Sequence, residues 1–235
     1  GILELALLAV WAILAKEPCQ QPTKMRTLSE VKQEKVSTWS GLQIVLRNRD
    51  VWLLTLIGIG YTGFSHGIMQ WLPYILSSYG LGPVMGYFVA SAEIWWNLVS
   101  TVLLPAISDR LKLRRPVIIA GAIVTSFFTY LLITGSGTTL WIASFSLGLF
   151  SAGILVLLFT VPTELESVGP KLTGSAAGMI HSIGHIGGFM SPVLVGYFKD
   201  VTGSFIYGIY TNIVFILSVV VFTVLSKESG QKQVS

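Results

Sequence analysis

The chain has 235 residues, of which 52% are hydrophobic and 11% are charged, whereas an average soluble domain is about 25% charged. This composition excludes an ordinary soluble domain. The formal net charge of +4 does not indicate nucleic-acid binding, because the basic residues follow the pattern of membrane orientation described below. The single cysteine, Cys19, excludes a disulfide within the chain.

Charged residues are absent from four long runs of the sequence. Two of them, residues 51–92 and 117–163, are each long enough for about two membrane passes, since one pass needs about 20 apolar residues. The other two cover residues 172–198 and 201–226. Backbone groups in lipid must be hydrogen-bonded within the segment, and the runs lack the alternating polarity of barrel strands. The sequence therefore predicts an all-α membrane protein.

The chain begins with an apolar stretch at residues 2–15, which we interpret as the end of a membrane helix that starts further upstream. A secretory signal is the competing interpretation, but the stretch lacks Met and a basic leader and contains Glu4. Residues 16–50 are predicted to form a basic loop between two halves of a bundle. Within it, four apolar residues at helical spacing are compatible with a short surface helix or with a solvated linker: Trp39, Leu42, Val45 and Leu46.

Glycine and proline divide the charge-free runs into six predicted spans. We expect helices at residues 51–78, 84–107, 117–135, 140–162, 173–198 and 204–225. They form one predicted domain, 51–226, which is followed by a tail at 227–235. All of the 15 Lys and Arg residues except Lys199 fall on one side of this arrangement. The positive-inside rule then predicts a multi-pass protein of the plasma membrane whose inter-half loop and C-terminus are cytoplasmic.

A basic motif stands between the second and third predicted spans. Residues 105–116 read Pro-Ala-Ile-Ser-Asp-Arg-Leu-Lys-Leu-Arg-Arg-Pro, which resembles the signature loop Gly-x-x-x-Asp-Arg-x-x-x-Arg-Arg of the major facilitator superfamily. Pro105 replaces the usual glycine. The glycine-rich segments at 174–178 and 187–192 are similar to the eleventh helix of that family, and residues 200–204 resemble the turn into its last helix.

The resemblance covers nearly the whole chain and implies a fold and a function. The fold would be the six-helix C-terminal half of a major facilitator superfamily bundle, preceded by the tail of another helix. The function would be secondary active transport of a small solute by alternating access, driven by a proton or solute gradient. Some of the features resemble anion and cyanate-type permeases. The implied partners are the substrate, the lipid bilayer, and either the missing N-terminal half of the same chain or a second copy.

The signature loop has its own physical interpretation. Asp109 is predicted at a helix end, where its carboxylate could accept hydrogen bonds from the N-terminus of a neighbouring helix. Arg110, Arg114 and Arg115 could pair with acids or lipid phosphates and hold the loop at the surface. Such a latch would favour one access state of a transporter. Ordinary positive-inside anchoring is the alternative.

Small residues at a spacing of four occur in three places in the predicted spans. Such pairs let two helices approach closely, either as static packing or as surfaces that slide during transport. The pairs are Gly63 with Gly67, Gly174 with Gly178, and Gly184 with Gly188.

Ionisable residues inside a span are costly to bury, so each is a candidate functional residue. They occur here with polar neighbours at i,i+4 spacing, which puts two polar side chains on one helix face. We predict that they line a substrate or proton pathway near mid-depth, as in transporters of this kind. The pairs are His66 with Gln70, Glu93 with Asn97, and His181 with His185.

Two other functions remain open from the residues alone. The histidines and Glu93 could hold a metal in an intramembrane enzyme, since two His at i,i+4 suit a metal ion. However, the sequence has no His-Glu-x-x-His motif, so we do not predict an enzyme. A non-transporting sensor on the same fold is the second alternative. No nucleotide-binding loop of the type Gly-x-x-x-x-Gly-Lys-Ser/Thr is present, so we expect no cofactor.

Overall fold

The computed structural model describes residues 38–165 and 167–229, and every regular element in this part of the chain is a helix. The short helix α2 (Thr38–Leu46) leads into α3 (Arg49–Leu76), which passes through a π-helical turn into α4 (Gly82–Leu111). The remaining helices are α5 (Arg115–Thr134), α6 (Thr138–Glu164), α7 (Gly169–Thr202) and α8 (Ile206–Leu225). The predicted helix tail at 2–15 and most of the loop at 16–50 lie outside the described residues.

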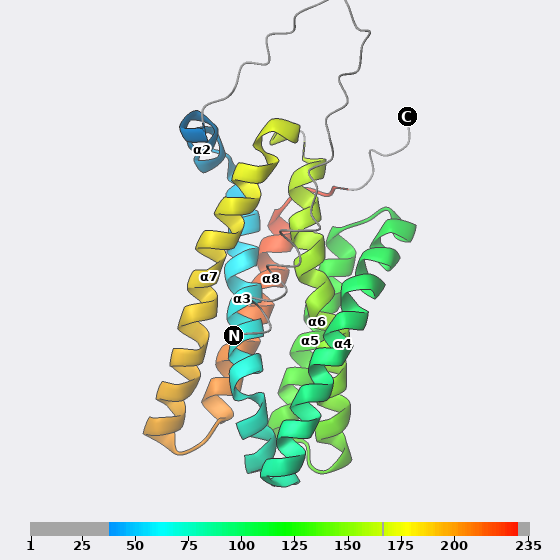
Figure 1. Ribbon diagram of the computed structural model, residues 1–235, viewed down its shortest axis with the longest axis vertical. Coiled ribbons are helices and arrows are strands. Elements are labelled where there is room, and N and C mark those ends of the chain that lie inside the picture. Colours follow the sequence, from blue (N-terminus) through cyan, green and yellow to red (C-terminus); the bar gives the residue numbers. More distant parts are fainter. Residues whose placement is uncertain (1–37, 166, 230–235) are drawn as a thin grey trace, which may run out of the picture. The chain divides into compact units, whose positions relative to one another are not determined.

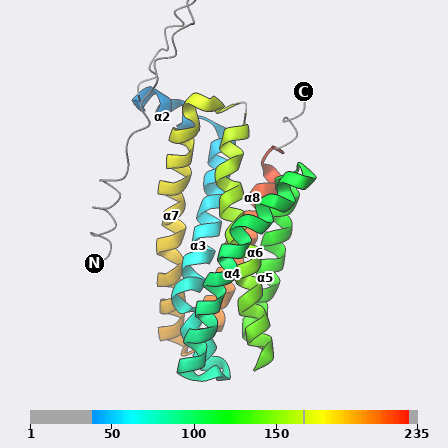
Figure 2. The same ribbon diagram turned by 45° about the vertical axis from the view of Figure 1, so that its right-hand side comes forward.

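The six long helices, α3 to α8, run up and down beside one another (Figure 1). One group consists of α3, α7 and α8, and the other of α4, α5 and α6. Helices α3 and α7 lie side by side in both views (Figures 1 and 2). The groups meet where α5 packs on α8, where α3 packs on α4, and where α6 contacts α3 and α7. Each predicted span corresponds to one of these helices, with ends that differ by a few residues.

Charge distinguishes the two ends of the bundle. Because successive helices alternate in direction, the starts of α3, α5 and α7 lie at the same end as the ends of α4, α6 and α8. We call this the basic end, because it carries the described basic side chains Arg47, Arg49, Arg110, Lys112, Arg114, Arg115 and Lys227. Lys199, near the end of α7, lies at the opposite end.

Within the described residues, four helical stretches are long and apolar enough to cross a membrane. The first, Arg49–Leu111, contains both α3 and α4, which fold back on each other. Helix α7 is not among the four, since its glycines, Ser182 and two histidines lower its hydropathy. It nevertheless packs along the length of α3. The polar residues of α7 therefore either pack against α3 or lie at a surface of this chain.

Sharp turns occur where the sequence places glycine. The break between the first two predicted spans is the π-helical turn Ser77–Leu81, where Gly80 has a φ of 108°, followed by Gly82 with a φ of 71°. Only glycine adopts such angles without steric cost. Helix α7 likewise ends on Gly203, with a φ of 72°. Helix α2 occupies the segment for which the sequence left a helix and a linker equally open.

Close helix contacts depend on some of the predicted glycines. Backbone meets backbone where Gly184 of α7 faces Gly58 of α3, since a Cβ built on Gly184 would lie 3.4 Å from the Gly58 carbonyl carbon. Gly63 leaves room for Phe215 of α8, and Gly67 leaves room for Asn212 of α8 and Ser191 of α7. A Cβ on Gly174 or Gly178 would meet nothing within 4 Å. Those two glycines therefore make no close contact with the described residues.

The contact between α4 and α6 depends on glycines that the sequence analysis did not select. A Cβ on Gly148 would collide with the carbonyl oxygen of Glu93, and one on Gly153 would lie 2.6 Å from the carbonyl oxygen of Ser100. The Gly153 N–H also donates to the Ser100 hydroxyl at 2.9 Å. The spacing of Ser144 and Gly148 is the small-residue signal that could have pointed to this face.

Candidate functional site

The polar side chains predicted inside the spans fall into two groups in the structure. In the first, Asn97 donates from Nδ2 to Oε1 of Glu93 at 2.9 Å, one turn along α4. Ser151 of α6 donates from its hydroxyl to Oδ1 of Asn97 at 3.2 Å. Glu93 is only 6% exposed. Its other carboxyl oxygen has no hydrogen-bond partner among the described residues.

The second group contains the three histidines, at the contact of α3 with α7. The ring centroids of His66 and His185 are 5.5 Å apart, and those of His181 and His185 are 4.3 Å apart. The His66 ring lies on Gly188, where a Cβ would be 3.0 Å from Nδ1. One turn away, the hydroxyl of Thr62 donates to the carbonyl oxygen of Gly184 at 2.5 Å. Helix packing therefore brings together imidazoles from two helices.

The Glu93 group and the histidine group lie at a similar depth along their helices, but they do not contact each other. His66, Glu93 and His185 lie 17, 18 and 16 residues from the basic ends of their helices, or about 24–27 Å at a rise of 1.5 Å per residue. No described hydrogen bond or ring contact joins Glu93 or Asn97 to a histidine. Gln70 is exposed, one turn beyond His66 on α3. No group of three metal-ligating side chains suited to a metal ion occurs within the described residues.

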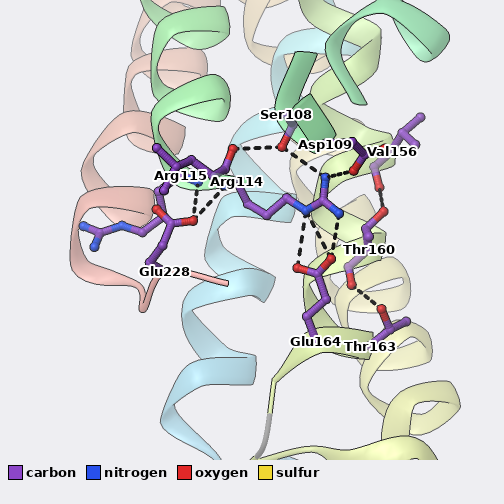
Figure 3. A network of polar contacts seen from close by, with 10 residues as sticks. Ser108, Asp109, Arg114, Arg115, Val156, Thr160, Thr163, Glu164 and Glu228 are labelled. Atoms are coloured by element: carbon purple, nitrogen blue, oxygen red, sulfur yellow. Dashed lines mark hydrogen bonds and ion pairs between the residues drawn. The ribbon is translucent and has the colours of Figure 1, made fainter. Parts of the chain in front are cut away.

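At the basic end, one guanidinium joins the ends of two helices (Figure 3). Arg114 Nη2 donates to Glu164 Oε1 of α6 at 2.7 Å, and its Nη1 donates to Asp109 Oδ1 of α4 at 2.5 Å. The same Nη1 donates to the hydroxyl of Ser108 at 3.1 Å. The Arg114 and Glu164 side chains are 10% and 13% exposed, whereas Asp109 is 63% exposed. The pair of Arg114 with Glu164 is therefore the enclosed part of this network.

The next residue, Arg115, takes part in a reciprocal contact between α5 and the end of α8. Its Nε donates to the carbonyl oxygen of Thr223 at 3.0 Å, and its Nη2 donates to that of Val224 at 2.5 Å. In return, Glu228 Oε1 accepts from the backbone N–H of Arg114 at 2.7 Å and of Arg115 at 3.2 Å. A cation thus satisfies free carbonyls at a helix C-terminus, and an anion satisfies free N–H groups at a helix N-terminus.

The expected partner of Asp109 differs from the one in the structure. The carboxylate of Asp109 pairs with Arg114, five residues along the chain, and the N–H groups at the start of α5 donate to Glu228 instead. Arg110 is exposed and makes no ion pair with a described residue.

Hydrogen bonding to Glu164 raises the pKa of Arg114 above its ordinary value. Arg114 is therefore charged at every pH at which a protein is normally studied.

A further link at this end involves residues that the sequence analysis did not select. Asp50 Oδ2 accepts from Lys227 Nζ and from the hydroxyl of Ser167, each at 3.2 Å. The amide of Asn48 donates to the carbonyl oxygen of Ser167 at 3.1 Å. Sequence alone offers one signal for three residues of this end, since each stands directly next to a charge-free run: Asp50, Glu164 and Lys227.

Comparison with known families identifies the chain. The model of the Major Facilitator Superfamily matches residues 1–192, which is most of the sequence. The chain belongs to the Major Facilitator Superfamily. Its all-α architecture is that of a six-helix half of a bundle of this superfamily, as the sequence predicted, and it is a multi-pass membrane protein. The relatives below are named as transporters, so the enzyme alternative has no support from them.

Curated members of the superfamily that are similar to this chain are themselves much longer than it. A protein of Agrobacterium vitis named as a candidate tartrate transporter is 31% identical over 188 residues, covering 75% of this chain and 42% of that protein. A protein of Bacillus subtilis named as a candidate galactarate/D-glucarate transporter, GudP, is 27% identical and covers 75% of this chain and 40% of its own length. The chain thus spans about two fifths of the length of the curated relatives it matches.

The fold is also similar to a solved structure of the superfamily. A variant of the E. coli fucose:proton symporter FucP superimposes with a TM-score of 0.72 at 14% identity. The match covers 94% of this chain and 52% of FucP. At this identity the similarity establishes the fold alone, and it agrees with a chain that forms half of such a bundle.

Proposed function

We propose that this chain is the C-terminal half of a secondary transporter that moves a small organic anion by alternating access, coupled to a proton or solute gradient. The observation that carries the proposal is the set of ionisable groups at one depth, Glu93 on α4 and the histidines on α3 and α7. Burying such groups in a membrane is costly, and each has a polar atom without a partner among the described residues. Transporters of this kind bind their cargo near the midplane.

The proposed cargo is a hydroxylated carboxylate. Tartrate and galactarate or glucarate, for which two relatives are named, are dicarboxylates with hydroxyl groups. In the described helices the imidazoles of His66 and His185 are the basic groups at mid-depth, so they are the natural partners for a carboxylate. The amides of Gln70 and Asn97 are suited to the hydroxyl groups, because an amide both donates and accepts hydrogen bonds.

Alternating access requires a second half of the bundle. We propose that this half consists of six further helices of the same protein, N-terminal to this chain, with a second copy of this chain as the alternative. The basic end is proposed to face the cytoplasm, because basic residues favour that side of a membrane. The loop of Asp109, Arg110, Arg114 and Arg115 would then latch the bundle at its cytoplasmic end.

The decisive experiment replaces Glu93 by Gln in the full-length protein, reconstituted in proteoliposomes. The substitution keeps an oxygen that can accept from Asn97 but removes the group that binds a proton. We expect gradient-driven accumulation of labelled tartrate or glucarate to be lost, while exchange across the membrane persists. Asp200→Asn, a carboxylate near the end of α7, is the matched control and should leave both activities unchanged.

Three results would contradict parts of this proposal. Gradient-driven uptake that is unchanged in the Gln variant would remove Glu93 from the coupling step. Reconstituted wild-type protein that moves no carboxylate under any gradient would overturn the substrate class and favour the sensor alternative. Stoichiometric zinc or iron in the purified protein would support the metalloenzyme instead.

A further inference from the structure

The hydrogen bonds of two histidines fix which ring nitrogen is free. His66 Nδ1 lies 3.0 Å from the carbonyl oxygen of Thr62, and His185 Nδ1 lies 2.8 Å from that of His181. A carbonyl oxygen can only accept, so each Nδ1 must carry the hydrogen, and a neutral imidazole then has its lone pair on Nε2. Neither Nε2 has a hydrogen-bond partner among the described residues. Both rings therefore offer the same atom to a ligand.

The backbone holds these two rings in place from opposite helices. Each ring is bonded to the carbonyl four residues earlier on its own helix, which restricts its rotation. Gly188 lies directly against the His66 ring, and the bond from Thr62 to the Gly184 carbonyl fixes α3 against α7 one turn away. The result is an edge-on pair with ring centroids 5.5 Å apart. A side chain at position 188 would push the rings apart.

A positive charge on this pair has no carboxylate partner among the described residues around it. Of the other groups near the pair, His181 is the third imidazole, and its ring faces Phe159 of α6. Helix α8 has no charged residue between Ile206 and Leu225, while Glu93 of α4 belongs to the separate group. The charged residues of α3 and α6, which pack against α7, lie near the basic end: Arg49, Asp50 and Glu164. On α7 itself, Lys199 and Asp200 lie near the opposite end.

We propose that His66 and His185 form one site that takes a proton and a carboxylate of the cargo together. A proton that binds to Nε2 turns this atom into a charged N–H donor, and the donor binds a carboxylate oxygen. Because the described helices around the pair supply no counter-ion, the anion stabilises the proton and the proton stabilises the anion. This inference rests on the proposed transport of a hydroxylated carboxylate, and it assigns to two residues the recognition of its charge.

The test measures binding of tartrate and of D-glucarate to the purified full-length protein by calorimetry at pH 5.5 and pH 7.5. The proposed site needs a protonated imidazole, and charge-assisted hydrogen bonds are the stronger ones, so binding should be about tenfold weaker at the higher pH. Proteoliposome uptake of the same two compounds is measured in parallel. It gives the pH profile and the KM separately from kcat.

Two substitutions at each position separate the ring nitrogens. His185→Asn puts an amide N–H where Nδ1–H lies but removes Nε2, and it should lose about tenfold or more in affinity at pH 5.5. His185→Gln puts an amide at the position of Nε2 but cannot take a proton, so it should bind weakly and without pH dependence. His66→Asn and His66→Gln should behave in the same way. Asp200→Asn, near the end of α7 and away from the pair, should keep the pH dependence of the wild type.

The outcomes separate this inference from the proposed function. Carboxylate uptake with unchanged KM and pH profile in both Asn variants would overturn the histidine site and leave the transport proposal standing. Gln variants that keep the wild-type pH dependence would also overturn it, because they cannot be protonated. Wild-type protein that neither binds nor transports either carboxylate would overturn both.

Discussion

The polar groups at the basic end and those at mid-depth use hydrogen bonds differently. At the basic end Arg114 joins α4 to α6, and Arg115 and Glu228 join α5 to the end of α8. At mid-depth His66, His185 and Glu93 each bond to a group on their own helix and leave one polar atom without a described partner. Bonds between helices stabilise a fold, whereas bonds within one helix orient a side chain.

This difference separates residues that build the bundle from residues that are available to a ligand. An ionisable group inside a membrane-spanning helix costs free energy, and the mid-depth groups gain few contacts between helices in return. We infer that their retention reflects a cargo or a proton and not the fold. Four predictions test this separation, from the largest expected effect on stability to the smallest.

Replacing Arg114 by Ala should cause the largest loss of stability. The change leaves Glu164, which is 13% exposed, without its partner, and breaking an enclosed ion pair in this way costs about 3–5 kcal/mol. The midpoint of thermal unfolding in detergent measures the effect. Arg110→Ala is the control, because Arg110 is exposed and has no described ion pair, and it should change stability by less than about 0.5 kcal/mol. Equal effects in both variants would contradict the central role of Arg114.

Replacing Gly148 by Ala should destabilise the contact of α4 with α6. The added Cβ would collide with the carbonyl oxygen of Glu93, and overpacking of this kind costs about 1–3 kcal/mol. The fraction of folded, monodisperse protein after heating gives a direct measurement. Gly178→Ala makes the matched control, since a Cβ there meets nothing within 4 Å. If the control loses as much stability as the Gly148 variant, the contact is not the cause.

Replacing Glu228 by Ala should have a moderate effect. The change removes the acceptor of the N–H groups of Arg114 and Arg115, and loss of a helix N-terminal cap costs about 1 kcal/mol. Thermal unfolding and hydrogen exchange of these two amides would detect it. Lys227→Ala, at a side chain that is 74% exposed, should change stability by less than about 1 kcal/mol. Unchanged exchange at both amides would show that Glu228 does not hold the start of α5.

The Asn variants of His66 and His185 should have the smallest effect on the fold. Each keeps a donor for the carbonyl four residues earlier, so unfolding should change by less than about 1 kcal/mol, although carboxylate binding is lost. Unfolding midpoints measured without ligand test this statement. A loss as large as that of Arg114→Ala would assign these histidines to the fold and would remove the contrast between the two regions.

Much of the fold could be predicted from local composition. The charge-free runs and the glycines between them placed all six spans within a few residues, because hydropathy and turn chemistry are properties of short segments. The same reasoning placed the signature loop between α4 and α5. It did not find Gly148 and Gly153, because a helix has many small residues and only the neighbouring helix decides which of them must be small.

The candidate site, like the fold, was predicted from the sequence only in part. The sequence determined which polar residues are embedded in apolar helices, and their spacing along each helix determined that they lie at one depth. Only the tertiary structure decided that the histidines meet at the contact of α3 with α7 while Glu93 turns to Asn97 and α6. It also decided that Arg114 pairs with Glu164, 50 residues away. Such pairs depend on the rotation and packing of whole helices, which no short segment of sequence specifies.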